Sequence, residues 1–143
     1  MSTTRNTSMM PARLTAVRPM LAVTDLNRTM EFYCEKLGFR CDITFGDPPV
    51  WCSLSRDDCE MMFNAPPRAE VIRDVPRTSK DYQIFYINVD DIVALHETLK
   101  ARGLSVTDLR VTVYGMKEFE LRDPDDYWLW FGQPTDEPPT VNE

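Results

Sequence analysis

The chain has 143 residues, 43% of them hydrophobic, and a formal net charge of −7. This length suffices for one domain with a hydrophobic core, and the acidic balance excludes the basic surface that nucleic acids and anionic membranes require. No apolar run approaches the roughly 20 residues of a membrane-spanning helix, and the N-terminal residues include no secretory apolar stretch. We therefore expect no nucleic-acid partner, no membrane partner and a cytoplasmic location.

Both ends of the chain differ in composition from its middle. Residues 1–14 are polar and carry no hydrophobic period, and residues 135–143 are rich in proline and acidic side chains. Such segments bury too little apolar surface to fold by themselves. We expect a disordered tail over 1–14, one domain over 15–134 and a flexible tail over 135–143.

An internal repeat organises the middle of the chain. LAVTDL at 21–26 and INVDDI at 87–92 share one pattern, 66 positions apart, and each leads into apolar residues at helical spacing. The helix N-cap candidates are Thr24 or Asp25 in the first copy and Asp90 or Asp91 in the second. Each helix is predicted to end at a glycine, Gly38 or Gly103, where a left-handed residue is common.

Strand-like segments follow both predicted helices, and residues 64–82 form a linker between the halves. These segments are CDITF (41–45), VWCSL (50–54) and EMMFN (60–64), then LSVTDLRV (104–111), KEFELR (117–122) and YWLWF (127–131). The predicted fold class is α+β. Two βαβββ repeats, about 15–64 and 82–134, form a cupped mixed sheet with the helices on its outer face.

The last predicted strand is apolar on both faces. Side chains alternate along a strand, so Trp128 and Trp130 share one face while Leu129 and Phe131 share the other. The hydrophobic core can cover only one of these two faces. The tryptophan face therefore requires a second cover, which is a ligand or the protein's own residues.

Three segments resemble the vicinal oxygen chelate superfamily, which comprises glyoxalases, bleomycin resistance proteins and ring-cleaving extradiol dioxygenases. They are RPMLAVTDLNRTMEFYCEKLGF (18–39), NVDDIVALHETLKARG (88–103) and GMKEFELRDPDDYWLWFG (115–132). The resemblance implies a paired βαβββ fold that is usually dimeric and holds a small molecule in each cup. We accordingly expect a homodimer with a small-molecule ligand.

The resemblance also implies where a divalent metal would be held. Its four positions fall here on Arg18, Ile84, Trp130 and either Glu60 or Met62. A catalytic metal needs about three protein ligands with suitable donor atoms, whereas arginine is always cationic and isoleucine and tryptophan donate nothing useful. We expect no metal, no other cofactor and no catalytic residue of the family type.

Alternation along the predicted strands gives the lining of the cup. The predicted ligand-binding residues are Arg18, Met20, Trp51, Glu60, Met62, Ile84, Tyr86, Asn88, Tyr114, Trp128 and Trp130. Aromatic side chains with a few polar groups suit planar, partly apolar ligands. Glu60 and the overall acidity favour a cationic group on such a ligand.

We favour a metal-independent binding protein that resembles the bleomycin resistance branch and sequesters an aromatic, cationic ligand, as in antibiotic resistance. One alternative is an enzyme: a metal-dependent lyase, epimerase or ring-cleaving dioxygenase, or a metal-free enzyme with Glu60 as general base and Arg18 stabilising an oxyanion. In a further alternative the tryptophans plug the cup, and the protein acts through its dimer surface.

Overall fold

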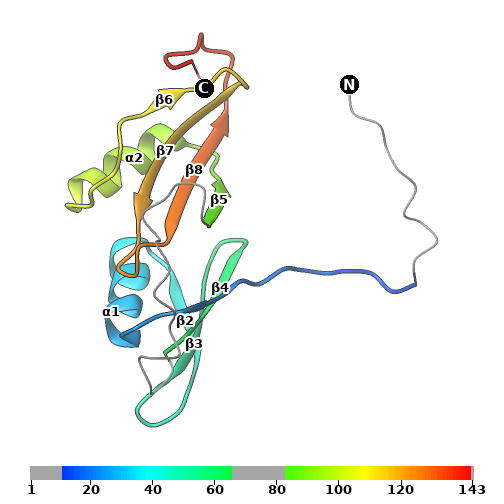
Figure 1. The fold of residues 1–143 in the computed structure, drawn as a ribbon, viewed down its shortest axis with the longest axis vertical. Coiled ribbons are helices and arrows are strands. Elements are labelled where there is room, and N and C mark those ends of the chain that lie inside the picture. Colours follow the sequence, from blue (N-terminus) through cyan, green and yellow to red (C-terminus); the bar gives the residue numbers. More distant parts are fainter. Residues whose placement is uncertain (1–10, 66–82, 143) are drawn as a thin grey trace.

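A computed structural model describes residues 11–65 and 83–142, which form two halves of like topology (Figure 1). The first half contains β1 (Met20–Ala22), α1 (Leu26–Met30), η1 (Glu31–Lys36), β2 (Arg40–Phe45), β3 (Trp51–Arg56) and β4 (Cys59–Asn64). The second contains β5 (Ile84–Asn88), α2 (Ile92–Ala101), β6 (Arg110–Val111), β7 (Met116–Arg122) and β8 (Trp128–Pro134). Positions 1–10 of the predicted tail and 66–82 of the predicted linker lie outside the described residues.

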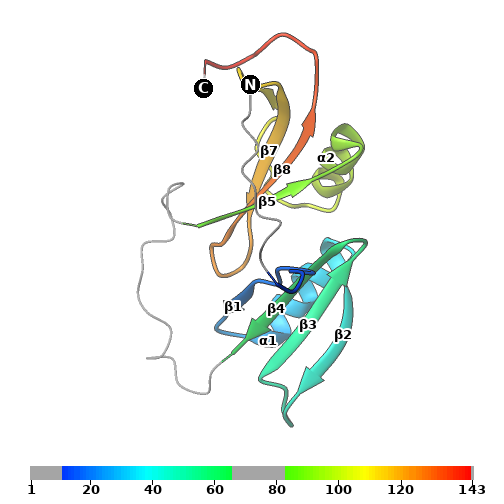
Figure 2. The same ribbon diagram turned by 90° about the vertical axis from the view of Figure 1, so that its right-hand side faces the viewer.

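Each half carries one four-stranded mixed sheet. The strand orders are β1-β4-β3-β2 and β5-β8-β7-β6, with the first and last strand of each half parallel and the other pairs antiparallel. Both helices lie on the same side of the two sheets (Figures 1 and 2). The predicted α+β class with two βαβββ repeats is confirmed.

The helix ends follow the predicted capping residues. The Asp25 side chain accepts a hydrogen bond from the Arg28 backbone N–H, and the Asp91 side chain accepts one from Ala94, both at 3.2 Å. Gly38 has φ +77° beyond the end of η1, where a left-handed backbone stops the helix. None of the described helical segments is long and apolar enough to cross a membrane.

One hydrophobic core joins the halves. Leu21, Val23 and Phe63 enter it from the first sheet, and Leu129 and Phe131 enter it from the second. These are the alternate residues that the sequence pattern assigns to the helix side of the strands. Burying both sheets against one core fixes which face of each strand points away from it.

The predicted strand over 104–111 is wrong except for its last two residues, Arg110 and Val111. Residues 104–109 contact β7 through Thr107, whose backbone N–H donates to the Glu120 carbonyl and whose hydroxyl accepts from the Glu120 N–H. The Thr107 carbonyl instead faces His96 of α2, at 2.9 Å from Nε2. A ladder needs successive backbone pairs, so this segment remains irregular.

The C-terminal segment contacts the second sheet. The Thr140 hydroxyl accepts a hydrogen bond from the Val111 backbone at 2.8 Å, and Lys117 pairs with Glu137 at 2.9 Å. The flexibility expected for residues 135–143 stays a prediction.

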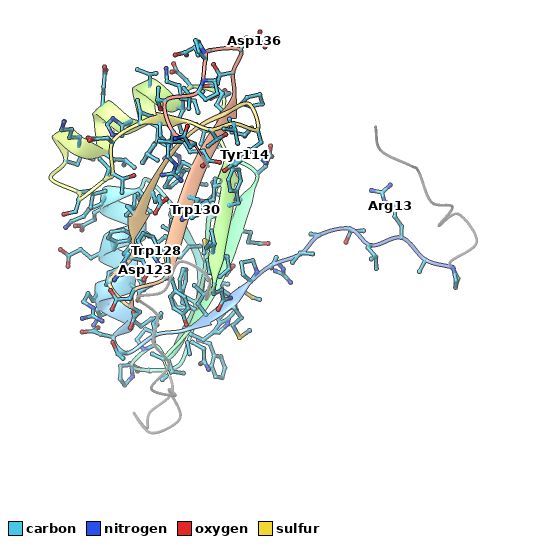
Figure 3. The ribbon with its side chains drawn as sticks, turned by 45° about the horizontal axis from the view of Figure 1, so that its top comes forward. Arg13, Tyr114, Asp123, Trp128, Trp130 and Asp136 are labelled. Atoms are coloured by element: carbon cyan, nitrogen blue, oxygen red, sulfur yellow. The ribbon has the colours of Figure 1, made fainter. Side chains whose placement is uncertain are left out.

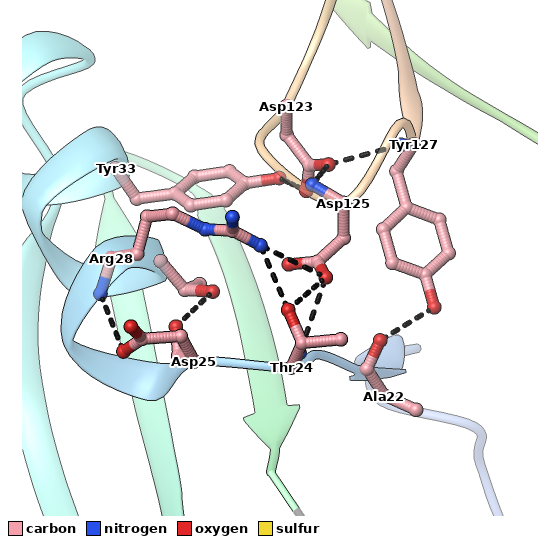
Figure 4. A network of polar contacts seen from close by, with 9 residues as sticks. Ala22, Thr24, Asp25, Arg28, Tyr33, Asp123, Asp125 and Tyr127 are labelled. Carbon is pink, nitrogen blue, oxygen red and sulfur yellow. Dashed lines mark hydrogen bonds and ion pairs between the residues drawn. The ribbon is translucent and has the colours of Figure 1, made fainter. Parts of the chain in front are cut away.

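A buried turn between β7 and β8 attaches the second half to α1 (Figure 4). Asp125 accepts hydrogen bonds from the backbone N–H and the hydroxyl of Thr24, at 3.1 and 2.9 Å. Arg28 lies 3.4 Å from the same carboxylate. The Tyr127 hydroxyl donates to the Ala22 carbonyl at 2.8 Å. Polar groups of the turn thus fix the position of one half on the other.

Asp123 completes this turn inside the core. Its carboxylate accepts hydrogen bonds from the Tyr33 hydroxyl and from the backbone N–H groups of Asp125 and Tyr127. Burial raises the pKa of Asp123 to about 6, while these hydrogen bonds oppose the rise.

The raised pKa predicts a specific pH dependence of stability. Between the ordinary pKa and about 6, the folded state binds more protons at Asp123 than the unfolded state, so the free energy of unfolding rises as pH falls. From pH 7 to 5 this contributes about 1 kcal/mol, which Asp123→Asn will remove. Urea unfolding of the wild-type protein and of Asp123→Asn at each pH gives the difference between their free energies of unfolding. Titrations that both proteins share cancel in this difference. A difference that is constant with pH would contradict the prediction.

Candidate functional site

Trp128 and Trp130 lie along β8 on the face of the sheet that points away from the core, called here the open face (Figure 3). Leu129 and Phe131 belong to the core, whereas Trp128 is buried without joining it and Trp130 is half-buried. The sequence-based assignment of the two faces therefore agrees with the structure. The residues that cover the tryptophans therefore lie on the side of the sheet opposite to the core.

Guanidinium groups and a tyrosine cover the two indoles. Arg110 Cζ lies 5.3 Å from the centre of the Trp130 ring, and Arg122 Cζ lies 4.3 Å from that of Trp128. The Tyr86 ring meets Trp130 edge-on, with 6.5 Å between centroids. Cations over indole faces are attracted by the ring quadrupole. Part of the tryptophan face is thus covered by the protein's own residues.

Two buried carboxylates lie beside this aromatic group. Glu118 and Glu120 are 0% and 1% exposed, and Arg110 Nη2 lies 3.0 Å from an oxygen of the first and 2.7 Å from one of the second. The hydroxyls of Tyr86 and Tyr114 donate to Glu118 Oε2 at 2.7 and 2.9 Å. A buried carboxylate with an arginine and two hydroxyl donors is well satisfied.

The tyrosines act as donors in this group and not as bases. Burial, followed by the hydrogen bond to Glu118, raises the pKa values of both Tyr86 and Tyr114. Gly132 permits the arrangement, because a Cβ at that position would overlap the Tyr86 hydroxyl. The absence of a side chain there lets Tyr86 cross β8 and reach Glu118 on β7.

The first half carries a simpler open face. Arg18 Nη1 lies 3.4 Å from Glu60 Oε1, with both side chains exposed, so the predicted pair is adjacent. Met20 pairs with Met62 across β1 and β4, and Trp51 is half-buried on β3. An exposed ion pair of this kind contributes little to stability.

The strand register resolves the choice left open between Glu60 and Met62. Met62 pairs with Met20, and Trp130 pairs with Tyr86, which stands 66 positions after Met20 in the repeat. Met62 is therefore the counterpart of Trp130.

The predicted site residues form two groups, one on each sheet. Arg18, Met20, Trp51, Glu60 and Met62 belong to the first, and Ile84, Tyr86, Asn88, Tyr114, Trp128 and Trp130 to the second. Within residues 11–65 and 83–142, no hydrogen bond, ion pair or ring contact joins the groups. Asn88 also lines a cavity between the halves. The role of these residues in ligand binding stays a prediction.

Sequence reasoning missed Arg110, Glu118 and Glu120, which hold the second group together. A signal for the two glutamates was present in KEFELR, where they alternate with core residues. Pairing this strand with WLWF across the DPDD turn places Glu120 opposite Trp130. Arg110 gave no such signal, because its segment lacks a clear alternation.

The model of the Glyoxalase/Bleomycin resistance protein/Dioxygenase superfamily matches residues 15–131. The chain belongs to this superfamily. No curated protein matches it significantly.

Solved structures of this superfamily's fold cover most of the chain. A bleomycin resistance determinant encoded on transposon Tn5 is 21% identical, with 87% of this chain and 100% of that chain covered and a TM-score of 0.68. A bleomycin-binding protein complexed with bleomycin is 22% identical (84% and 98% covered, TM-score 0.67). TnmS3, an antibiotic-binding protein from Streptomyces sp. CB03234, is 20% identical (87% and 99%, TM-score 0.64). At this identity the likeness extends to the fold alone.

The metal positions of the superfamily do not fit a divalent ion here. Of Arg18, Ile84, Trp130 and Met62, none offers an anionic or imidazole donor, and the neighbouring Glu60 already faces Arg18. The part of the chain that the structure describes holds no group of three or more His, Cys, Asp or Glu side chains able to bind a metal. A single carboxylate is too few for a catalytic site.

Proposed function

We propose that the protein binds a small aromatic molecule carrying a positive charge, without a metal ion, on the open face of its sheets. It does so as a homodimer in the cytoplasm, and it sequesters its ligand without chemical change. The structures of bleomycin-binding and antibiotic-binding proteins with the same fold support this class of function. The proposal rests mainly on Trp130 and the side chains around it, which are Tyr86, Arg110, Glu118 and Glu120.

Trp130 has the properties of a stacking platform. Its indole N–H is buried and has no hydrogen-bond partner among the residues that the structure describes, although buried polar groups are nearly always paired. The other two tryptophans, Trp51 and Trp128, also lie on the open face. A planar ligand would stack on the part of the Trp130 ring that is still exposed.

The position of Arg110 supports a cationic ligand. Its guanidinium stands over an indole and beside two buried carboxylates, an arrangement that stabilises a positive charge. A ligand guanidinium or ammonium would meet the same groups if Arg110 turned outward. The cation–π part of such a contact contributes about 0.5–2 kcal/mol.

Exposed apolar side chains support the dimer. Met20, Ile43 and Phe45 are 57%, 58% and 70% exposed and point to the open face of the first sheet. Met20 lies on one edge strand of this sheet and Ile43 and Phe45 on the other, and large apolar side chains left exposed on one face are typical of an interaction surface. A second copy of the chain would cover them and enclose the ligand.

The proposal predicts that binding depends on Trp130. Metal-free bleomycin, followed by a panel of planar aromatic cations, will quench tryptophan fluorescence saturably, because all three tryptophans lie on the open face. Trp130→Leu will weaken binding of the best ligand by about tenfold or more, which corresponds to a lost stacking contact of about 1.4 kcal/mol. Isothermal titration gives the affinities.

Val93→Ala, on the exposed side of α2, is the matched control, and circular dichroism checks that both variants are folded. Equal affinity of Trp130→Leu and the control would contradict the proposed site.

A further inference from the structure

A fissure between the two halves, separate from the tryptophan face, consists of two adjoining cavities of about 340 and 380 Å³. Arg56, Val89, Asp90 and Leu95 line both. One wall comes from the end of η1 and the turn between β3 and β4. The other comes from the end of β5 and the start of α2. Each volume lies within the range of ligand pockets, about 300–1,000 Å³.

The floor of the fissure is apolar. It is formed by Leu37, Phe39, Ile87, Val89, Leu95 and Phe131. Four of these side chains pack against the core without being buried, so the fissure opens part of the core to solvent. An alkyl chain in this space would remove apolar surface from water on both sides. Each methylene buried in this way tightens binding by about fourfold.

The rim of the 340 Å³ cavity is acidic. Asp57, Asp58 and Asp90 are exposed around it. The one arginine there, Arg56, is already engaged, since its Nη1 donates to the Leu37 carbonyl at 2.8 Å and its Nε lies 3.6 Å from Asp57. Three carboxylates against one occupied guanidinium favour a positive charge at the mouth.

We propose that this fissure is a second ligand site, which takes a single-chain amphiphile with a cationic end group. The alkyl chain lies along the apolar floor, and the charged end remains at the rim near Asp58 and Asp90. The site is independent of the open face, because its floor belongs to the core side of the sheets.

The test uses dodecyltrimethylammonium below its micelle concentration, with isothermal titration into the full-length chain. We expect one molecule per chain, bound about three- to tenfold more tightly than neutral dodecyl maltoside because of the exposed carboxylates. Octyltrimethylammonium will bind more weakly because it buries fewer methylenes. Dodecyl sulfate will bind more weakly than the maltoside.

Four variants locate the binding. Leu95→Trp fills the cavity and will weaken binding at least tenfold, whereas Val93→Trp, on the exposed side of the same helix, will leave it unchanged. The double variant Asp58→Asn/Asp90→Asn, which alters only exposed side chains, will abolish the preference for the cation. Trp130→Leu will have no effect, which distinguishes this site from the open face.

Absent binding, or equal affinity for all three head groups, would overturn the proposal. So would binding that is lost in Trp130→Leu but kept in Leu95→Trp, because the amphiphile would then occupy the open face. If Leu95→Trp fails to fold, the double aspartate variant decides alone.

Discussion

Replacing Arg110 with methionine will lower the free energy of unfolding by about 2–4 kcal/mol. The arginine pairs with the buried Glu118 and Glu120, and its loss leaves Glu118, among the residues that the structure describes, with the hydroxyls of Tyr86 and Tyr114 as donors. Methionine keeps the apolar stem over Trp130, so the loss measures charge pairing more than packing. The expected loss of unfolding free energy is smaller than that for a fully buried ion pair, because the Arg110 side chain is 21% exposed.

Arg122→Met is the matched control for this change. Arg122 also stands over a tryptophan, but its ion pair with Asp126 is long, at 3.9 Å, and largely exposed, whereas Arg110 pairs with two buried carboxylates, so we expect a smaller cost than for Arg110→Met. Urea unfolding at neutral pH measures both variants. Adding Glu118→Gln to Arg110→Met will recover part of the stability, because the charge that lost its partner is removed. Equal losses of unfolding free energy in Arg110→Met and Arg122→Met would contradict the prediction that the ion pairs of Arg110 with Glu118 and Glu120 stabilise the fold.

Asp125→Ala will cost about 2–4 kcal/mol, since it removes a buried acceptor that bonds three groups of the other half. These are the backbone N–H and hydroxyl of Thr24 and the guanidinium of Arg28. The Thr24 N–H will be left without this partner at the start of α1. Both halves will be affected, because the turn that carries Asp125 makes buried polar contacts with the first half.

The neighbouring Asp126 provides the control for this turn. It is exposed and has a positive φ of 65°, and the one contact of its side chain within residues 11–65 and 83–142 is the long ion pair with Arg122. Asp126→Asn suits the same backbone and will change stability by less than about 0.5 kcal/mol. Thermal unfolding followed by circular dichroism compares the two. A similar melting temperature for both variants would show that the Asp125 contacts contribute little.

Periodicity in the sequence predicted the features that depend on neighbouring residues. Alternation in WLWF assigned Leu129 and Phe131 to the core and Trp130 to the opposite face. The repeat at 21–26 and 87–92 predicted two halves of like topology, and the capping residues Asp25 and Asp91 were each one of two candidates that the sequence offered. These features follow from local geometry, which a sequence pattern encodes directly.

Features that depend on distant contacts could not be predicted in this way. The pairing of Arg110 with Glu118 and Glu120 requires knowledge of where a two-residue strand joins β7. The irregular course of residues 104–109 depends on Thr107 and its contact with His96 of α2. The fissure depends on how the two halves are packed, which Asp123 and Asp125 control through buried bonds that no period reveals.

Membership of the superfamily does not by itself select a function. Its fold carries binding proteins as well as enzymes, so the choice depends on the side chains at the site. Here the positions proposed for the superfamily's metal hold residues that do not coordinate metals, and we propose Trp130 as a stacking platform for the ligand. Metal-independent binding is the function that this set of residues supports best.

Isothermal titration of the EDTA-treated protein with metal-free bleomycin and the panel of planar aromatic cations tests this claim most directly. We expect saturable binding of at least one compound, with an affinity that does not change when Mn²⁺, Fe²⁺, Co²⁺, Ni²⁺ or Zn²⁺ is added, and with the compound recovered intact. Binding that requires one of these ions would contradict metal-independent binding. Turnover that requires one would identify the protein as a metal-dependent enzyme.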